Sequence, residues 1–169
     1  MPIAELLIPE FDNEMGRTRR VLERLPDGKL DWRPHEKSWT LRELATHVAQ
    51  IPGWLTYAIR TDELDIAPVD GPPMEQPRPE STAGILALFE GALGEARAAL
   101  AGTKDDAFDA TWTLKAGGKT IFSASRYMVV RETVLNHLVH HRGQLTVYLR
   151  QCGAPVPGTY GPSADEPNS

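Results

Sequence analysis

Two histidines four residues apart are the residues in this sequence best suited to chemistry. His137 and His141 lie in segment 136–144, which continues a long helical pattern of apolar residues. Residues four apart are neighbours on one helix face, so both imidazoles can bind the same cation, and histidine is the commonest metal ligand. His47 lies on another amphipathic segment. Together the three predict a metal site with room left for water or a substrate.

On a helical wheel, all three histidines face the interior between the helices. At about 100° per residue, His137 and His141 fall within an apolar arc, His47 borders the apolar arc of its own segment, and His140 falls outside. The two arcs consist of Val130, Val134, Leu138, Leu145 and Tyr148, and of Leu44, Val48, Ile51 and Leu55. An unsatisfied buried imidazole costs about 1–3 kcal/mol. Three converging imidazoles therefore favour a bound cation.

Several side chains near this interior have two interpretations. Gln144 could orient a ligand or a bound water, or it could be a surface glutamine. Glu43 could serve as a base or as the acceptor for a ligand's second nitrogen, although its spacing from Thr40 favours a helix cap. Trp54 and Tyr57 could wall a pocket or belong to the core. The sequence identifies no catalytic residue among them.

Two further residues are interpreted as structural. Arg142 could reach an anion, but an ion pair within the bundle explains it equally well. Cys152 ends the last helical pattern and is interpreted as a small packing residue rather than a nucleophile or ligand.

The elements that position these residues are mostly helical. Apolar periodicity predicts helices over residues 3–25, from 40 through 55, 82–101 and 125–152. Pro9 predicts a short leading turn or a kink in the first helix, and Pro52 predicts a bend in the second. Gly153 and Pro155 end the fourth helix. Segments 111–115 and 119–123 flank an Ala-Gly-Gly turn and predict a small β-hairpin.

A proline-rich segment separates the second and third helices. Residues 65–80 contain five prolines, which excludes a helix there. At about 3.1 Å per residue, this segment could span a bundle about 30 Å long. The second and third helices would then run parallel, with the segment crossing over between them. The irregular tail after Gly153 is expected to lie over the bundle surface, and residues 1–169 are expected to form one domain.

Composition narrows the class of protein. The formal net charge of -5 and the lack of a clustered basic face argue against nucleic acid as a partner. No apolar stretch is long enough to span a membrane, and the N-terminus lacks the basic region of a signal peptide. A single cysteine allows no intrachain disulfide, which suits a reducing cytoplasm. We therefore expect a cytoplasmic protein that binds neither nucleic acid nor membrane.

Two motifs carry a resemblance to a known family. One is segment 137–150, His-Leu-Val-His-His-Arg-Gly-Gln-Leu-Thr-Val-Tyr-Leu-Arg, which is followed by Gly-Ala-Pro-Val-Pro and by Tyr-Gly-Pro-Ser beginning at Tyr160. The other is segment 38–48, Ser-Trp-Thr-Leu-Arg-Glu-Leu-Ala-Thr-His-Val. In this order they resemble the signature of the DinB/YfiT-like family, and the similarity covers most of the chain.

The resemblance implies an all-α fold, a four-helix bundle in up-down-down-up order. It also implies a divalent metal, nickel or zinc, held by His47, His137 and His141, with His140 at a variable position. Family members often form dimers, so a homodimer is expected. Some relatives transfer low-molecular-weight thiols such as bacillithiol, or isomerise maleylpyruvate with mycothiol. The resemblance thus predicts a metal-dependent enzyme of the thiol-transferase or hydrolase type acting on a small molecule, with a low-molecular-weight thiol as co-substrate in the transferase case.

Other functions remain compatible with the sequence. Hydrolysis of an ester or amide by metal-activated water is as coherent chemically as thiol transfer. A non-catalytic binding or dimerisation module with packed histidines would contain no metal and would be unaffected by chelators. A stress-linked metal sensor or store would usually close its coordination shell with side chains, and no fourth ligand is evident.

Overall fold

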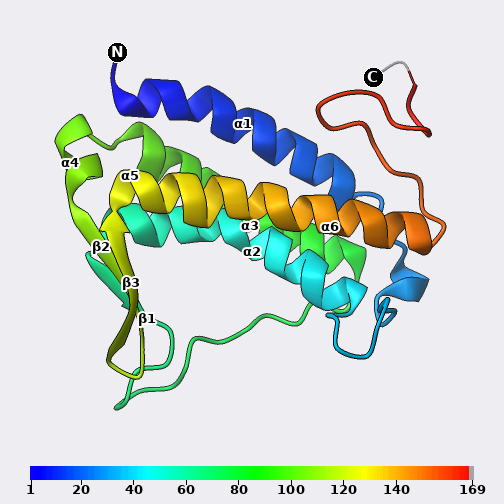
Figure 1. Ribbon diagram of the computed structural model, residues 1–169, viewed down its shortest axis with the longest axis horizontal. Coiled ribbons are helices and arrows are strands. Elements are labelled where there is room, and N and C mark those ends of the chain that lie inside the picture. Colours follow the sequence, from blue (N-terminus) through cyan, green and yellow to red (C-terminus); the bar gives the residue numbers. More distant parts are fainter. Residues whose placement is uncertain (168–169) are drawn as a thin grey trace.

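Four long helices build the computed structural model, which describes residues 1–167. They are α1 (Ile3–Leu22), α2 (Leu41–Arg60), α3 (Thr82–Ala101), and a fourth made of α5 (Arg126–Met128), the π-helical segment η2 (Val129–Asn136) and α6 (His137–Gln151). Figure 1 shows α1 and the fourth helix running one way and α2 and α3 the other. The predicted up-down-down-up bundle is confirmed.

The predicted apolar stripes form the core of the bundle. Helix α2 packs against α3 and α6, and α1 packs against α3. Phe11, Ile51, Phe89 and Leu145 bring one side chain from each long helix into the same buried cluster. Fully burying a side chain of this size stabilises the fold by about 1.5–3 kcal/mol, so the stripes rather than intrinsic propensity hold the helices together.

Local signals fix where α2, α3 and α6 begin or end. The Thr40 side chain accepts a hydrogen bond from the Glu43 amide, and the Glu43 side chain accepts one from the Thr40 amide. This is the predicted capping box. Ser81 caps α3 through the Gly84 amide. After α6, Gly153 adopts a φ of 75°, a left-handed conformation that ends the helix as predicted.

The first helix continues through Pro9, so the separate leading turn, one of the two alternatives predicted there, does not form. Proline removes one amide donor from the helix. The buried side chains of Leu7 and Phe11, on either side of Pro9, anchor both parts to the core. This packing offsets the lost hydrogen bond.

A small sheet lies at one end of the bundle. The predicted hairpin is confirmed as β2 (Thr111–Ala116) and β3 (Lys119–Ser125), which pair antiparallel. A third strand, β1 (Glu63–Asp65), pairs parallel with β2 and was not predicted, because three residues are too few to show an alternating pattern. The Asp65 carboxylate accepts hydrogen bonds from the amides of Gly117 and Gly118 in the hairpin turn.

The proline-rich segment crosses the bundle as expected. Figure 1 shows it leaving the sheet and running along the molecule to the start of α3 at the opposite end. Two short elements complete the chain: a 3₁₀ turn η1 (Asp27–Lys29) and helix α4 (Asp105–Asp109). Neither was predicted, since both are too short for periodicity to detect.

The C-terminal tail lies against the bundle, as predicted. The Thr159 carbonyl accepts a hydrogen bond from Arg17 of α1 at 2.9 Å, and Asp165 pairs with Arg150 of α6. Within residues 1–167, none of the helices combines the length and the apolar composition needed to cross a membrane.

Candidate metal centre

Three histidines from two helices meet in the interior of the bundle. The Nε2 atom of His137 lies 3.2 Å from Nε2 of His47 and 2.8 Å from Nε2 of His141. One ring nitrogen from each of the three lies within 4.8 Å of the other two. The side chains are half-buried, so the cluster is embedded in the protein yet still reached by solvent. The structure thus brings together all three residues selected from the sequence.

Two local features aim these rings. In α2, the buried neighbours Leu44 and Val48 fix the rotation that turns His47 toward α6. Before α6, the chain is π-helical, and the His137 amide donates to the carbonyl of Glu132 rather than to that of Thr133. The Thr133 carbonyl lies 3.2 Å from Nδ1 of His137. π-helical turns occur often at functional sites, and this one pairs a backbone acceptor with a candidate ligand.

The partners of Nδ1 assign the tautomers of two rings. Nδ1 of His137 faces the Thr133 carbonyl, and Nδ1 of His141 lies 2.7 Å from Oε1 of Gln144. Both oxygens only accept hydrogen bonds, so each Nδ1 carries a proton and each Nε2 has a lone pair. Those two lone pairs face each other across 2.8 Å. They repel unless a cation lies between them, so the donor set fits a metal.

Electrostatic effects keep the three histidines in their neutral form. Burial, followed by the charges of His141 and His137, lowers the pKa of His47 to about 4. Burial is also the main cause that lowers the pKa of His137 and of His141. A histidine whose pKa is lowered is neutral at pH 7, and a neutral imidazole is the form that binds metal.

Two tryptophans enclose the cluster. The Trp54 ring lies 5.4 Å from the ring of His47 and 5.3 Å from that of His137. The Trp39 ring lies 4.9 Å from His47 and 5.7 Å from His141. Trp54 also packs against the apolar core, the second of the two interpretations that the sequence allowed. The role of Trp39 was missed because it lies in a loop without periodicity; its place directly before the Thr40 cap is the signal that could have identified it.

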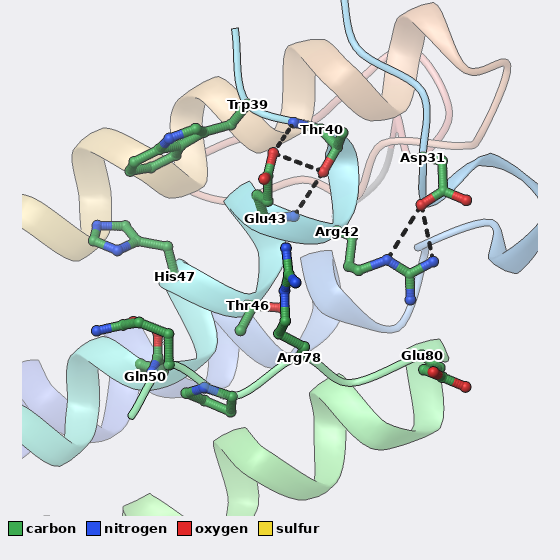
Figure 2. Close-up of a pocket in the computed structure, with 12 residues that line it drawn as sticks. Asp31, Trp39, Thr40, Arg42, Glu43, Thr46, His47, Gln50, Arg78 and Glu80 are labelled. Atoms are coloured by element: carbon green, nitrogen blue, oxygen red, sulfur yellow. Dashed lines mark hydrogen bonds and ion pairs between the residues drawn. The ribbon is translucent and has the colours of Figure 1, made fainter. Parts of the chain in front are cut away.

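Two hollows that share Trp39 in their linings each contain one of the three histidines. The His47 hollow, lined by Trp39, Thr46, His47, Gln50, Arg78 and neighbouring residues, has a volume of about 740 Å³ and is drawn in Figure 2. The His141 hollow, lined by Lys37, Trp39, His141, Gln144, Val147 and others, has a volume of about 510 Å³. Both are within the range typical of small-molecule sites.

The sequence model of the DinB family matches residues 2–168. This protein belongs to the DinB family. The chain is 29% identical over 161 residues to the uncharacterized protein YrdA of Bacillus subtilis strain 168, covering 94% of this chain and 89% of that protein. Family membership agrees with the motifs around His47 and His141.

Solved structures share the fold of this DinB protein. A DinB-like protein from Bacillus cereus ATCC 10987 superposes with a TM-score of 0.70 at 24% identity, covering 94% of this chain and 98% of that one. The DinB-like protein YjoA from Bacillus subtilis gives a TM-score of 0.67 at 16% identity, covering 91% and 97%. Both similarities support the bundle with its small sheet.

The structure of this DinB protein also places the other residues that the sequence analysis considered near the site. Glu43 caps α2, and its hydrogen bonds to the amide and hydroxyl of Thr40 lower the pKa of its carboxyl group. Gln144 contacts His141, the orienting role considered from the sequence. Tyr57 is exposed and lies neither in the core nor along either hollow. His140 is exposed and lies outside the cluster of Nε2 atoms.

Arg142 and Cys152 are structural in this DinB protein. The Arg142 side chain is 2% exposed and lies 2.6 Å from Oε2 of Glu14, so it forms an ion pair within the bundle. Cys152 packs against the core, and burial raises the pKa of its thiol. Both outcomes agree with the interpretations made from the sequence.

Proposed function

We propose that this DinB protein is a divalent-metal-dependent enzyme whose ion is held by His47, His137 and His141. The observation that supports the proposal is the pair of Nε2 lone pairs facing each other across 2.8 Å, with both Nδ1 atoms committed to acceptors. Zinc and nickel both suit imidazole donors. Three protein ligands leave a coordination position open for a substrate, as in catalytic rather than structural zinc sites.

Thiol transfer to an electrophile is the reaction that we favour. A divalent cation with three neutral donors supplies Lewis-acid chemistry, which lowers the pKa of a thiol or a water in its open position. In hydrolysis, a protein side chain such as a carboxylate can assist by accepting a proton from the attacking water. Within residues 1–167, the acidic groups along the His47 hollow are Asp31, Glu43 and Glu80. Glu43 is committed to the α2 cap, and Asp31 to Arg42.

The substrates in this proposal are small molecules: an electrophile and a low-molecular-weight thiol as a co-substrate. The two hollows that share Trp39, of about 740 and 510 Å³, can each admit one of them. The protein acts as a homodimer in the cytoplasm, without nucleic acid or membrane as a partner. Sedimentation of the purified protein tests the dimer, and a monomer at micromolar concentration would contradict it.

Elemental analysis of the purified protein tests the metal site. We expect about one divalent ion per chain, and loss of most of it in His47→Ala. The matched control is His140→Ala, because this exposed histidine lies outside the cluster and its loss should leave metal content unchanged. Unchanged metal content in His47→Ala would remove His47 from the ligand set and overturn the proposed site.

A second experiment tests the reaction class. The metal-loaded protein is incubated with thiols and electrophiles, and conjugates are measured by mass spectrometry before and after chelation. Conjugation that depends on both the metal and the thiol supports the proposal. Ester cleavage without thiol conjugation favours the hydrolase alternative. A metal-free protein that chelators do not affect favours a non-catalytic binding or dimerisation module.

A further inference from the structure

The His47 hollow contains side chains that the proposed metal site does not use. It lies between the first turns of α2 and the segment 76–80 that precedes α3. Figure 2 shows His47 and Gln50 along one side, and Arg78 reaching from the crossing segment toward α2 beside Thr46. A ligand in this hollow would therefore lie beside a candidate metal ligand and within the reach of a guanidinium group.

Only one of the two arginines in this hollow is available to a ligand. Arg42 donates to the Asp31 carboxylate at 3.0 Å and to the Pro79 carbonyl at 2.9 Å, so its guanidinium is already paired. Among residues 1–167, Arg78 makes no hydrogen bond or ion pair. A guanidinium presents several donors in a planar fork that matches a carboxylate.

The acidic groups of the hollow do not neutralise Arg78 by direct contact. Asp31 is paired with Arg42, and Glu80 is exposed. Figure 2 shows the Glu43 carboxylate turned toward Thr40, away from Arg78, and both of its hydrogen bonds to Thr40 hold it there. The hydrogen bonds from Thr40, and to a smaller extent the nearby charge of Arg78, lower the pKa of the Glu43 carboxyl group, but the Arg78 guanidinium forms no hydrogen bond or ion pair with it.

One buried hydroxyl lies in the wall of this hollow. Thr46 lines the hollow and is 6% exposed, and its hydroxyl has no hydrogen-bond partner within residues 1–167. Buried polar groups are rarely left without a partner. The amide of Gln50, one turn further along α2, lines the same wall. Arg78 is therefore the charged donor that this hollow presents to an anionic group.

We propose that the His47 hollow is a subsite for a small organic anion, whose carboxylate binds Arg78 while its other end reaches the histidine cluster. This inference rests on the proposed function, because it assigns a carboxylate to one of the two substrates. Arg78 is a substrate-binding residue in this scheme and is not a ligand of the metal.

Binding of matched thiols to the zinc-loaded protein tests the subsite. The probes are unbranched ω-mercaptocarboxylates of three to six carbons and the corresponding neutral mercaptoalcohols, with dissociation constants measured by calorimetry. At least one carboxylate should bind about tenfold more tightly than its alcohol, since a charge-assisted hydrogen bond contributes that much. In Arg78→Gln, the carboxylate should bind about as tightly as its alcohol, while the affinity for the alcohol stays unchanged.

The matched control is Arg60→Gln, which removes the same charge from an exposed arginine at the end of α2 that does not line the hollow. It should keep the carboxylate preference. Equal affinities for acid and alcohol across the whole series overturn the anion subsite while leaving thiol binding intact. If neither class of thiol binds, the proposed thiol function fails instead. In that case, glutarate and its neutral analogue glutaramide test the anion subsite without a thiol. Binding of glutarate but not of glutaramide, abolished in Arg78→Gln, supports the subsite. Absence of glutarate binding overturns the subsite.

Discussion

The side chain of Gln144 determines which nitrogen of His141 faces the cluster. Its Oε1 accepts from Nδ1 at 2.7 Å, which leaves Nε2 with the lone pair that points toward His137. The Thr133 carbonyl has the same effect on His137. Such partners of a ligand fix its tautomer and orientation and raise its basicity. One exposed glutamine and one backbone carbonyl therefore prepare two of the three candidate ligands.

Replacing Gln144 with alanine should weaken metal binding without abolishing it. Loss of the acceptor frees the His141 ring to rotate and to change tautomer, and the metal affinity should fall about tenfold, as is typical of such partners. Competition with a chromophoric chelator measures the change. Gln151→Ala, an exposed glutamine at the end of α6, is the control. Equal affinities for the two variants would show that the Gln144 contact is incidental.

The lowered pKa values predict that the metal-free protein loses stability in mild acid. The ordinary pKa of 6.5 applies to His47 in the unfolded chain, and the folded value is about 4. Between these values the unfolded chain binds a proton that the folded chain excludes, so folding stability falls as the pH decreases. Thermal unfolding from pH 7 to 5 should show a falling melting temperature. His47→Gln should flatten this dependence, and an identical slope in that variant would contradict the assignment.

At the scale of elements, two local departures from a plain helix serve the site. The capping box at Thr40 fixes where α2 begins, two turns before His47. The π-helical segment Val129–Asn136 resets the register before α6, so that His137 and His141 start a regular helix with their Nε2 atoms facing α2. Both helices are anchored by the same buried cluster, which keeps the three rings together.

Thr40→Ala should destabilise the fold while sparing the site. Loss of an N-cap side chain costs about 1 kcal/mol of the free energy of unfolding, which urea denaturation can measure. Metal content should be retained, because His47 lies beyond the first turn and its neighbours Leu44 and Val48 stay buried. Thr40→Ser keeps the cap and should resemble the unchanged protein. Loss of metal in Thr40→Ala at unchanged stability would show that the cap acts on the site directly.

At the scale of the whole molecule, a polar cluster ties α1, α6 and the C-terminal tail together. The Arg142 guanidinium donates to the Glu14 carbonyl at 3.1 Å and to the Tyr160 hydroxyl at 2.7 Å. The Tyr160 hydroxyl donates in turn to the Glu14 carboxylate at 2.7 Å. Arg17 lies over the Tyr160 ring at 4.8 Å. The conspicuous tail motif around Tyr160 is therefore part of the fold rather than of the metal site.

Breaking this cluster should cost far more than breaking an exposed ion pair on the same helix. Glu14→Ala leaves Arg142 buried without its partner, and such changes destabilise by about 3–5 kcal/mol. Tyr160→Phe removes one hydroxyl and should cost about 1 kcal/mol. Glu10→Ala is the control, because Glu10 pairs with Arg131 in a partly exposed position, and such pairs contribute less than about 1 kcal/mol. Urea unfolding of the three variants should give this order, and a Glu14→Ala value close to that of Glu10→Ala would contradict it.

Short-range sequence signals predict much of this architecture. The apolar periods of the four helices, the capping box at Thr40, the Gly153 stop and the Gly-Gly hairpin turn act over a few residues, so the sequence alone predicts them. The proline-rich segment limits the topology because its reach is set by backbone geometry. The same periodicity places His47, His137 and His141 on inward faces, and motif resemblance selects them from the other histidines.

Only the tertiary structure decides what these residues meet. His47 and His137 are 90 positions apart in sequence, and their contact depends on how α2 and α6 rotate and slide against each other in the core. The position of Trp39 over the rings, the pairing of β1 with β2, the Arg142–Glu14 cluster and the free Arg78 fork likewise arise between distant segments. Local propensity does not encode such contacts, because their free energy comes from burial and pairing that exist only once the helices are assembled.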